Sequence, residues 1–260
     1  MSISTQKAGM KSVCRGETSH VPQTNYDLAK KRLDSAMSRL KHLAPFITPC
    51  RASDSACMVA SAMSATPVLA AGVPQLGLSP LDPMTVDRVT SNQAGLQLQM
   101  TDTTVKGLKN CVVMSMKRSA RKTNMELKCP AVLLTGDYKL GGKLLILPIE
   151  GNGKYKIKIR DFVVKIQYEM AEEERGGEKF WKVISWKHTS DVLTNVQFQF
   201  QNLFNGNQNA ADAIHQFANN NWKDIYHEVA PPVVKALIGN VIKEIEKLFQ
   251  KVPINQLALD

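Results

Sequence analysis

Apolar and polar residues alternate through the middle of the chain, between residues 96 and 204. Apolar residues occupy the odd positions over 155–159, and they shift to the even positions over 162–170. Strict alternation predicts strands with one buried face, and a one-residue phase slip predicts a β-bulge near Arg160 and Asp161. Because a bulge bends and twists its strand, we expect a strongly curved antiparallel sheet.

The pattern becomes helical after Asn207, where apolar residues recur at intervals of three and four as far as Phe249. Pro231 and Pro232 must end or kink a helix, so they divide this pattern into two segments. Together the segments would form about 40 residues of helix, or about 60 Å. The second segment is apolar over a wide arc, which predicts that other elements wrap around it.

Two shorter helices are expected nearer the N-terminus. Asp54 is an N-cap signal for a helix over 54–71, which Pro67 is expected to bend or shorten. The glycines and prolines of 73–83 predict an extended connector that cannot be helical. Residues 25–43 combine helical apolar spacing with basic residues, which predicts either a helix that docks on a partner or membrane surface, or a merely solvated helix.

Positive charge is concentrated near the N-terminus. The chain has 260 residues, 33 Lys and Arg against 23 Asp and Glu, and a net charge of +10. Residues 1–42 carry half of this charge; they are expected to be disordered at first and then to form the basic amphipathic helix. Residues 43–260 are only mildly basic and form the expected folded domain. We therefore expect a monomer with no nucleic-acid partner.

The five cysteines leave at least one thiol free. Cys50 and Cys57 are close enough in sequence to close a small loop. A hairpin is predicted around Ala120, and Cys111 and Cys129 lie equally far from it, so they fall opposite one another. Because directly opposed strand cysteines tend to give strained bridges, we expect two buried thiols there rather than a disulfide.

Motifs for catalysis and metal binding are missing from the sequence. There is no nucleophile elbow, zinc-protease motif, phosphate loop or C-x-x-C pair, and the five histidines have no metal-ligand spacing. No stretch approaches the roughly 20 apolar residues of a membrane-spanning helix. The first 42 residues also lack the apolar core of a secretory signal. We expect a non-enzymatic protein without a cofactor or metal.

Several motifs follow one another in the order typical of one insect family. They are the segment from Pro49 to Cys57, the connector over 72–83, LTGDY at 134–138, GKLLILPI at 142–149 followed by Gly-Asn-Gly at 151–153, NLFNG at 202–206, and FANNNW at 217–222. Together they resemble the takeout and juvenile-hormone-binding-protein family. That resemblance implies an α+β fold in which a highly curved antiparallel β-sheet wraps a long C-terminal helix, similar to one half of a BPI-type protein of the TULIP superfamily.

The resemblance also implies a function: a carrier that binds a juvenile-hormone-like sesquiterpenoid, or another long apolar molecule, in an internal pocket. It implies that the helix over 54–71 is a gate anchored by a disulfide between Cys50 and Cys57, and that the protein is extracellular, in haemolymph. Tyr168 is the expected polar anchor, since a phenol can donate to an ester or epoxide oxygen. The candidate ligand-binding residues, each of which could instead be ordinary core, are Val59, Met63, Tyr168, Phe198, Phe200, Phe217, Trp222 and Ile225.

Two features depart from the family pattern. A polar, basic segment of more than 40 residues stands where a signal peptide is expected, and no cysteine follows Cys129, so the second disulfide of the moth hormone carriers has no counterpart. An alternative function is therefore an interaction protein on the same fold that docks on a partner or an anionic membrane surface through residues 25–43.

Overall fold

The computed structural model describes Lys30 and residues 42–260. Within it, Leu43–Asp260 forms one compact unit. The predicted basic extension over 1–42, with its amphipathic helix over 25–43, falls almost entirely outside the described residues and stays a prediction.

Three shorter strands form one side of a six-stranded antiparallel sheet: β1 (Met84–Gln93), β2 (Leu96–Lys106) and β3 (Val112–Ser119). β1 pairs with β2, and both β2 and β3 pair with β4. The alternation in the sequence predicted strands only from residue 96, so β1 was missed. Its buried positions change phase at Asp87, where the pairing with β2 skips a residue, so no simple alternation marks this strand.

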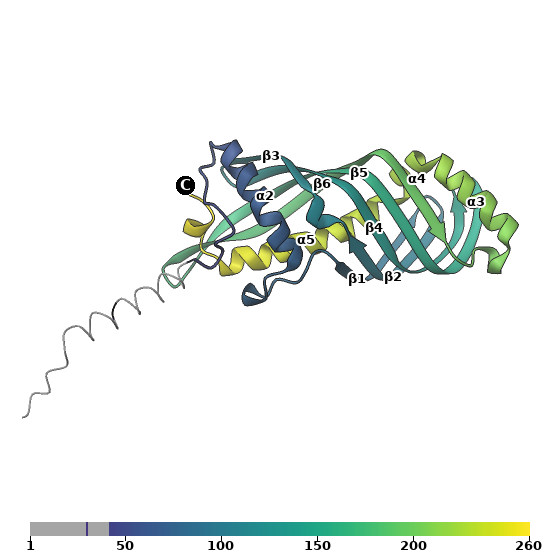
Figure 1. Ribbon diagram of the computed structural model, residues 1–260, viewed down its shortest axis with the longest axis horizontal. Helices are drawn as coiled ribbons and strands as arrows, with labels where there is room; N and C mark the ends of the chain where they lie inside the picture. The colour runs from purple at the N-terminus through teal and green to yellow at the C-terminus, as the bar shows by residue number, and fades with distance from the viewer. Residues whose placement is uncertain (1–29, 31–41) are drawn as a thin grey trace, which may run out of the picture. The chain divides into compact units, whose positions relative to one another are not determined.

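Three long strands form the rest of the sheet: β4 (Lys122–Leu144), β5 (Leu147–Arg175) and β6 (Glu178–Phe200). The register between β5 and β6 shifts between Arg160 and Phe162, which confirms the predicted bulge. Asp161 has a φ of 55° at that point, and the buried side chains change from odd to even positions across it. The bulge lets the long strands curl (Figure 1).

The C-terminal region forms three helices: α3 (Gln208–Asn220), α4 (Trp222–Val229) and α5 (Pro231–Lys251). The predicted boundary at Pro231 is confirmed, but the segment before it is divided once more. Asn221 ends α3, because both its backbone N–H and its side-chain amide donate to the Phe217 carbonyl, at 2.9 and 2.8 Å. Its φ and ψ are not helical.

Helix α2 (Ser55–Ala71) matches the predicted helix over 54–71. Asp54 is its N-cap, and the carboxylate accepts from the backbone N–H of Cys57 at 2.9 Å. Pro67 lies inside the helix without ending it. The following connector was predicted to contain no helix, but Pro74–Leu76 forms a 3-10 turn. Proline is tolerated at the first position of such a turn because its missing N–H would have no partner there.

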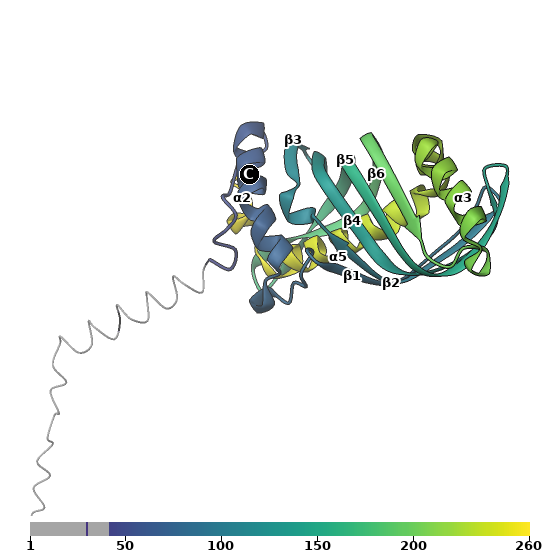
Figure 2. The ribbon, with the colours of Figure 1, turned by 45° about the vertical axis from the view of Figure 1, so that its right-hand side comes forward.

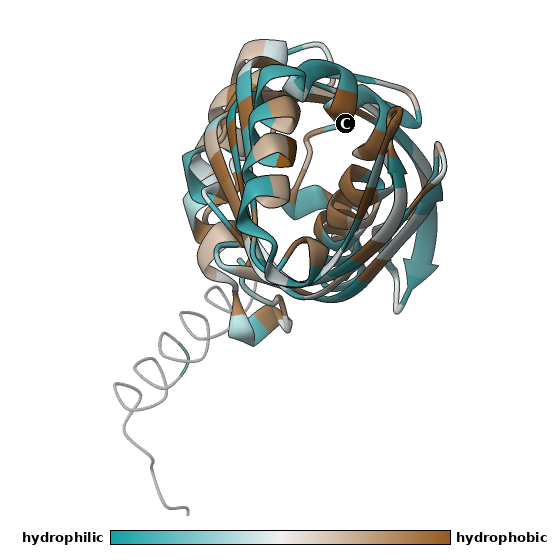
Figure 3. Cartoon of the chain, turned by 90° about the vertical axis from the view of Figure 1, so that its right-hand side faces the viewer, coloured by the Kyte–Doolittle hydropathy of each residue, from teal (hydrophilic) through white to brown (hydrophobic). Residues whose placement is uncertain are grey.

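The long α5 lies along the inner side of the curled sheet (Figures 1 and 2). At one end of the sheet are α2 and the C-terminal residues, including the 3-10 turn Ile254–Gln256; at the other end are α3 and α4. Figure 3 is a view along the long axis. In it the strands form a curved wall, and hydrophobic residues lie along the helices. The chain thus builds an apolar interior that is covered by different helices at its two ends.

Cys111 and Cys129 form a disulfide, so the expectation of two free thiols was wrong. Ser119 pairs with Lys122, but a bulge between Val113 and Ser115 changes the register, so Cys111 still comes opposite Cys129. Cys111 precedes β3 and directly follows the 3-10 turn Leu108–Asn110. Its backbone is therefore not held in the regular ladder that disfavours a bridge. Cys50 and Cys57 form a second disulfide.

Candidate functional site

An internal cavity of about 300 Å³ lies between the sheet and α5 at the end covered by α2. Its volume is at the lower limit of the roughly 300–1,000 Å³ typical of small-molecule sites. Its walls come from α2, β3, β4, β5, α5 and the C-terminal segment, and most of its lining is aliphatic or aromatic. Five flexible methionines contribute, which suits ligands of varied shape: Met58, Met84, Met116, Met125 and Met170.

Two polar side chains of α2 on this wall are already hydrogen-bonded. The Ser61 hydroxyl donates to the Thr48 carbonyl and accepts from the Thr48 N–H, both at 2.9 Å. The Thr66 hydroxyl donates to the Ala62 carbonyl at 2.8 Å. These groups satisfy one another within the protein and leave little capacity for a ligand.

Three further polar side chains form a row across three strands. Arg118 on β3 is the cross-strand partner of Thr123 on β4, and Thr123 is the partner of Tyr168 on β5. All three line the first cavity, and we call them the polar row. Thr123 is only 1% exposed, and its Oγ1 has no hydrogen-bond partner within the described part of the chain. A buried hydroxyl without a partner is costly, so this atom would gain from a hydrogen bond, although it is covered by protein atoms in this structure.

Burial determines the state of Tyr168. The side chain is buried, and desolvation raises the pKa of its phenol to about 12, against smaller opposing effects of the nearby Thr123 hydroxyl and the Arg118 charge. The Thr123 hydroxyl is near enough to lower the pKa of the phenol slightly, but the pair does not meet the criteria of a hydrogen bond. At neutral pH the phenol is therefore protonated and can donate a hydrogen bond.

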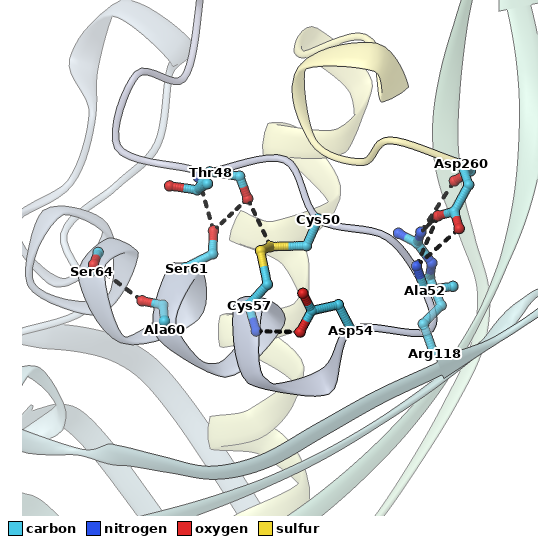
Figure 4. The surroundings of a disulfide bond; sticks show 10 residues. All are labelled: Thr48, Cys50, Ala52, Asp54, Cys57, Ala60, Ser61, Ser64, Arg118 and Asp260. Carbon is cyan, nitrogen blue, oxygen red and sulfur yellow. Dashed lines mark hydrogen bonds and ion pairs between the residues drawn. A yellow bond between two sulfur atoms is a disulfide. The ribbon is translucent and has the colours of Figure 1, made fainter.

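Arg118 is held from both sides. Its guanidinium lies 5.1 Å from the centre of the Trp181 ring and forms an ion pair with Asp260. The Asp260 carboxylate also accepts from the backbone N–H of Ala52, at 2.8 and 3.1 Å, next to the Cys50–Cys57 disulfide (Figure 4). The cation is thus fixed at the closed end of the cavity.

A second cavity, of about 110 Å³, lies at the end covered by α3 and α4. His215 and Tyr226 are the polar side chains on its wall. The Nε2 atom of His215 accepts from the Phe200 N–H at 3.0 Å, and the Tyr226 hydroxyl donates to Ser190 at 2.7 Å. This end of the interior therefore offers only apolar contact.

The two cavities share part of their lining. Leu134 and Ile159 of the sheet, and Val234 and Leu237 of α5, contribute to both. Along β4, Thr123 is eleven residues from Leu134, which corresponds to about 36 Å of strand. A ligand that extends from one cavity to the other would pass these four side chains.

The predicted ligand-binding residues are divided among three places. Tyr168 lines the first cavity, whereas Phe198, Phe200 and Ile225 line the second. The other four, Val59, Met63, Phe217 and Trp222, line neither cavity.

Helix α2 presents a different face to the cavity than the sequence suggested. Met58, Ala62, Ala65 and Leu69 line it at intervals of three and four, whereas Met63 lies at the edge of β3 and its sulfur accepts from the Val113 N–H at 3.0 Å. Because α2 is apolar or small on every side, its sequence does not show which side faces inward.

Sequence reasoning missed Arg118 and Thr123. A signal was available, since both follow the inward alternation of the hairpin that was predicted around Ala120. Arg118 looked like one of several surface cations of the hairpin, and only the tertiary contact with Asp260 and Trp181 distinguishes it.

Searches of the described residues gave no sign of metal chemistry or of a membrane span. Among Lys30 and residues 42–260, no three His, Cys, Asp or Glu side chains are grouped to hold a metal ion. In the same residues, no helix is both long enough and apolar enough to cross a bilayer.

Comparisons with known proteins agree with this architecture. A profile of the family described as haemolymph juvenile hormone binding protein (JHBP) matches residues 33–259. The circadian clock-controlled protein daywake of Drosophila melanogaster is 24% identical over 221 residues, covering 80% of this chain and 85% of that protein. The crystal structure of Epiphyas postvittana Takeout 1 is 31% identical with a TM-score of 0.80, covering 82% of this chain and 100% of the other. The Takeout 1 match confirms the predicted fold class.

Proposed function

The chain belongs to the haemolymph juvenile hormone binding protein family, and on that premise we propose what it carries and how. Members of the family are non-enzymatic binding proteins, and membership implies a carrier of lipophilic ligands. The ligand is a long apolar molecule with one oxygenated end, such as a juvenile-hormone-like sesquiterpenoid. Its polar end lies at the polar row of the first cavity, and its tail extends toward the second.

The apolar first cavity with its single polar row carries this proposal. An apolar tail gains about 25 cal/mol for each Å² removed from water. A lone oxygen would lose its hydrogen bonds to water on entry, and the Tyr168 phenol on the cavity wall can replace one of them. For about 20 heavy atoms at roughly −0.3 kcal/mol each, the binding free energy is about −6 kcal/mol, which a well-fitted ligand would exceed.

Helix α2 is the proposed gate. Its face toward the cavity consists mainly of small residues, including Ser61, Ala62 and Ala65, so lifting it exposes little apolar surface. The Cys50–Cys57 disulfide ties its first turn to the preceding segment. Gly72 follows its last turn with a φ of 82°, a conformation that suits glycine at a pivot.

Two disulfides are typical of proteins that fold in an oxidising compartment. Together with the family match, they support our proposal that the protein acts outside cells, in haemolymph.

Filling the first cavity from α2 tests the proposed function. Ala65 is buried on its wall, so Ala65→Trp should occupy the space of the ligand. The matched control is Ala60→Trp, on the exposed side of the same helix. We expect uptake of a juvenile-hormone-like ester, measured by native mass spectrometry, to be lost in Ala65→Trp and kept in Ala60→Trp. Equal uptake by both variants would place the ligand elsewhere.

A further inference from the structure

A carboxylate of the protein already lies at the polar end of the first cavity. The Asp260 side chain pairs with the Arg118 guanidinium and accepts two contacts from the Ala52 N–H (Figure 4). The main-chain oxygen of Asp260 also accepts from the guanidinium, at 3.1 Å, so a ligand would displace both oxygens. The Arg118 side chain is 9% exposed and lines the cavity, whereas the Asp260 side chain is 42% exposed. Asp260 thus reaches the buried cation from the solvent side of the wall.

Arg118 has more donors than Asp260 uses. A guanidinium carries five N–H groups in a planar fork that matches a carboxylate, and the fully buried Thr123 hydroxyl beside it has no partner among the described residues. Tyr168 completes the row as a protonated phenol. A cation, a hydroxyl and a phenol therefore lie on neighbouring strands of the cavity wall.

We propose that the polar row is a carboxylate subsite, and that the head group of an acidic amphiphile, such as a long-chain fatty acid, displaces Asp260 from Arg118. This inference rests on the proposed function, because the tail of the amphiphile needs the apolar cavity. One anion replaces another on a permanently charged guanidinium, so the charge balance of the pair is kept. Asp260 is already partly hydrated, so its release to water costs little.

Displacement of Asp260 would also loosen the closure of the cavity. The Asp260 carboxylate holds the Ala52 N–H, and the neighbouring Leu259 N–H donates to the Cys50 carbonyl at 3.1 Å. Cys50 is bonded to Cys57 in the first turn of α2. An acidic ligand therefore acts on the segment that leads into the proposed gate, whereas a neutral ester leaves this contact in place.

The experiment compares hexadecanoic acid with its methyl ester on the full chain at neutral pH, each displacing a neutral naphthylamine dye. The variants are Asp260→Asn, which removes the side-chain charge and leaves the main-chain oxygen of Asp260 on Arg118, and Arg118→Met, which removes the cation and keeps an apolar stem. We expect Asp260→Asn to strengthen binding of the acid by roughly three- to tenfold and to leave binding of the ester unchanged. We expect Arg118→Met to weaken binding of the acid alone.

Each other outcome is informative. If Asp260→Asn weakens acid and ester equally, Asp260 only holds the structure together and the inference is overturned, although the proposed function stands. If neither the acid nor the ester displaces the dye from the unmodified protein, the proposed function itself fails. The Asp260→Asn result decides the question even if Arg118→Met does not fold, because a gain in affinity cannot come from damage to the fold.

Discussion

The two ends of the interior differ in chemistry. The end under α2 contains a cation, a phenol and a hydroxyl that has no partner among the described residues, all among flexible methionines. The end under α3 and α4 is apolar, and its two polar side chains are occupied by hydrogen bonds within the protein. This difference gives the interior a direction, so an amphiphile has one favourable orientation, with its head under α2.

The coverings of the two ends differ as well. Helices α3 and α4 bury large side chains against the sheet, among them Ile214, Ile225 and Tyr226. Helix α2 lays mostly small residues on its cavity, together with Met58 and Leu69. At about 0.8 kcal/mol per buried methylene, Ile225 and Tyr226 of α4 each contribute more to holding their helix than a serine or alanine of α2 does. We therefore propose that the end that recognises the head group is also the end that opens more easily.

A carboxylate introduced at one end or the other should give the largest difference in the free energy of unfolding. Ile214→Asp puts an unpaired charge in the apolar second cavity, and we expect a loss of about 3–5 kcal/mol in the free energy of unfolding at neutral pH. Burial raises the pKa of such a carboxyl, so the loss should shrink as the pH falls and the group is protonated. Thr123→Asp, beside Arg118, should cost clearly less. Equal losses in denaturant unfolding would mean that the ends do not differ.

The disulfides offer a second comparison, within the α2 end. Replacing Cys111 and Cys129 by serine opens a loop with a sequence separation of 18, and we expect a loss of about 3 kcal/mol. Replacing Cys50 and Cys57 opens a separation of 7, and we expect about 2 kcal/mol. The second pair should nevertheless speed ligand release more, since it frees the proposed gate. Stopped-flow release of a bound dye measures this, and the reverse ranking of release rates would contradict a gate at α2.

The sequence predicted the elements better than it predicted the site. The bulge at Asp161, the boundaries of α2 and the start of α5 at Pro231 follow from local rules of alternation, capping and proline geometry. These features are decided by neighbours in the chain, and the structure confirms them.

The site depends on contacts between distant segments. Arg118 gains its position from Asp260, which is 142 residues away in the chain, and Cys111 meets Cys129 because a bulge adjusts the register. The inward face of α2 is set by β3 and not by its own pattern, which is why Met63 faces the strand edge. No local rule predicts such contacts.

Removing the phenol tests the polar row with a smaller effect. Tyr168→Phe deletes one donor, and we expect about fivefold weaker binding of an ester, equivalent to roughly 1 kcal/mol. Binding of a pure hydrocarbon of equal length should not change. Tyr226→Phe is the control at the other end, where the hydroxyl already bonds to Ser190. Equal weakening of both ligands by Tyr168→Phe would indicate lost packing and not a lost hydrogen bond.

Alkaline titration tests the burial of the phenol through an effect that vanishes at neutral pH. Burial raises the pKa of Tyr138, Tyr155 and Tyr168 from 10.0 to about 12. The folded chain therefore keeps protons that the unfolded chain releases, so the free energy of unfolding is unaffected below about pH 10 and falls as the pH approaches 12. Tyr168→Phe should reduce this slope by up to about 1.4 kcal/mol per pH unit. An unchanged slope would mean that Tyr168 is not desolvated.

The direction of the interior can be tested most directly by photocrosslinking. Two analogues of one long-chain ester would carry a photoreactive group, either beside the ester or at the far end of the tail. We predict that the head label modifies the hairpin around Arg118 and Thr123, and that the tail label modifies α5 near Val234 and Leu237 or the lining of the second cavity. Labels that exchange these positions, or that both react only at the surface, would contradict the account.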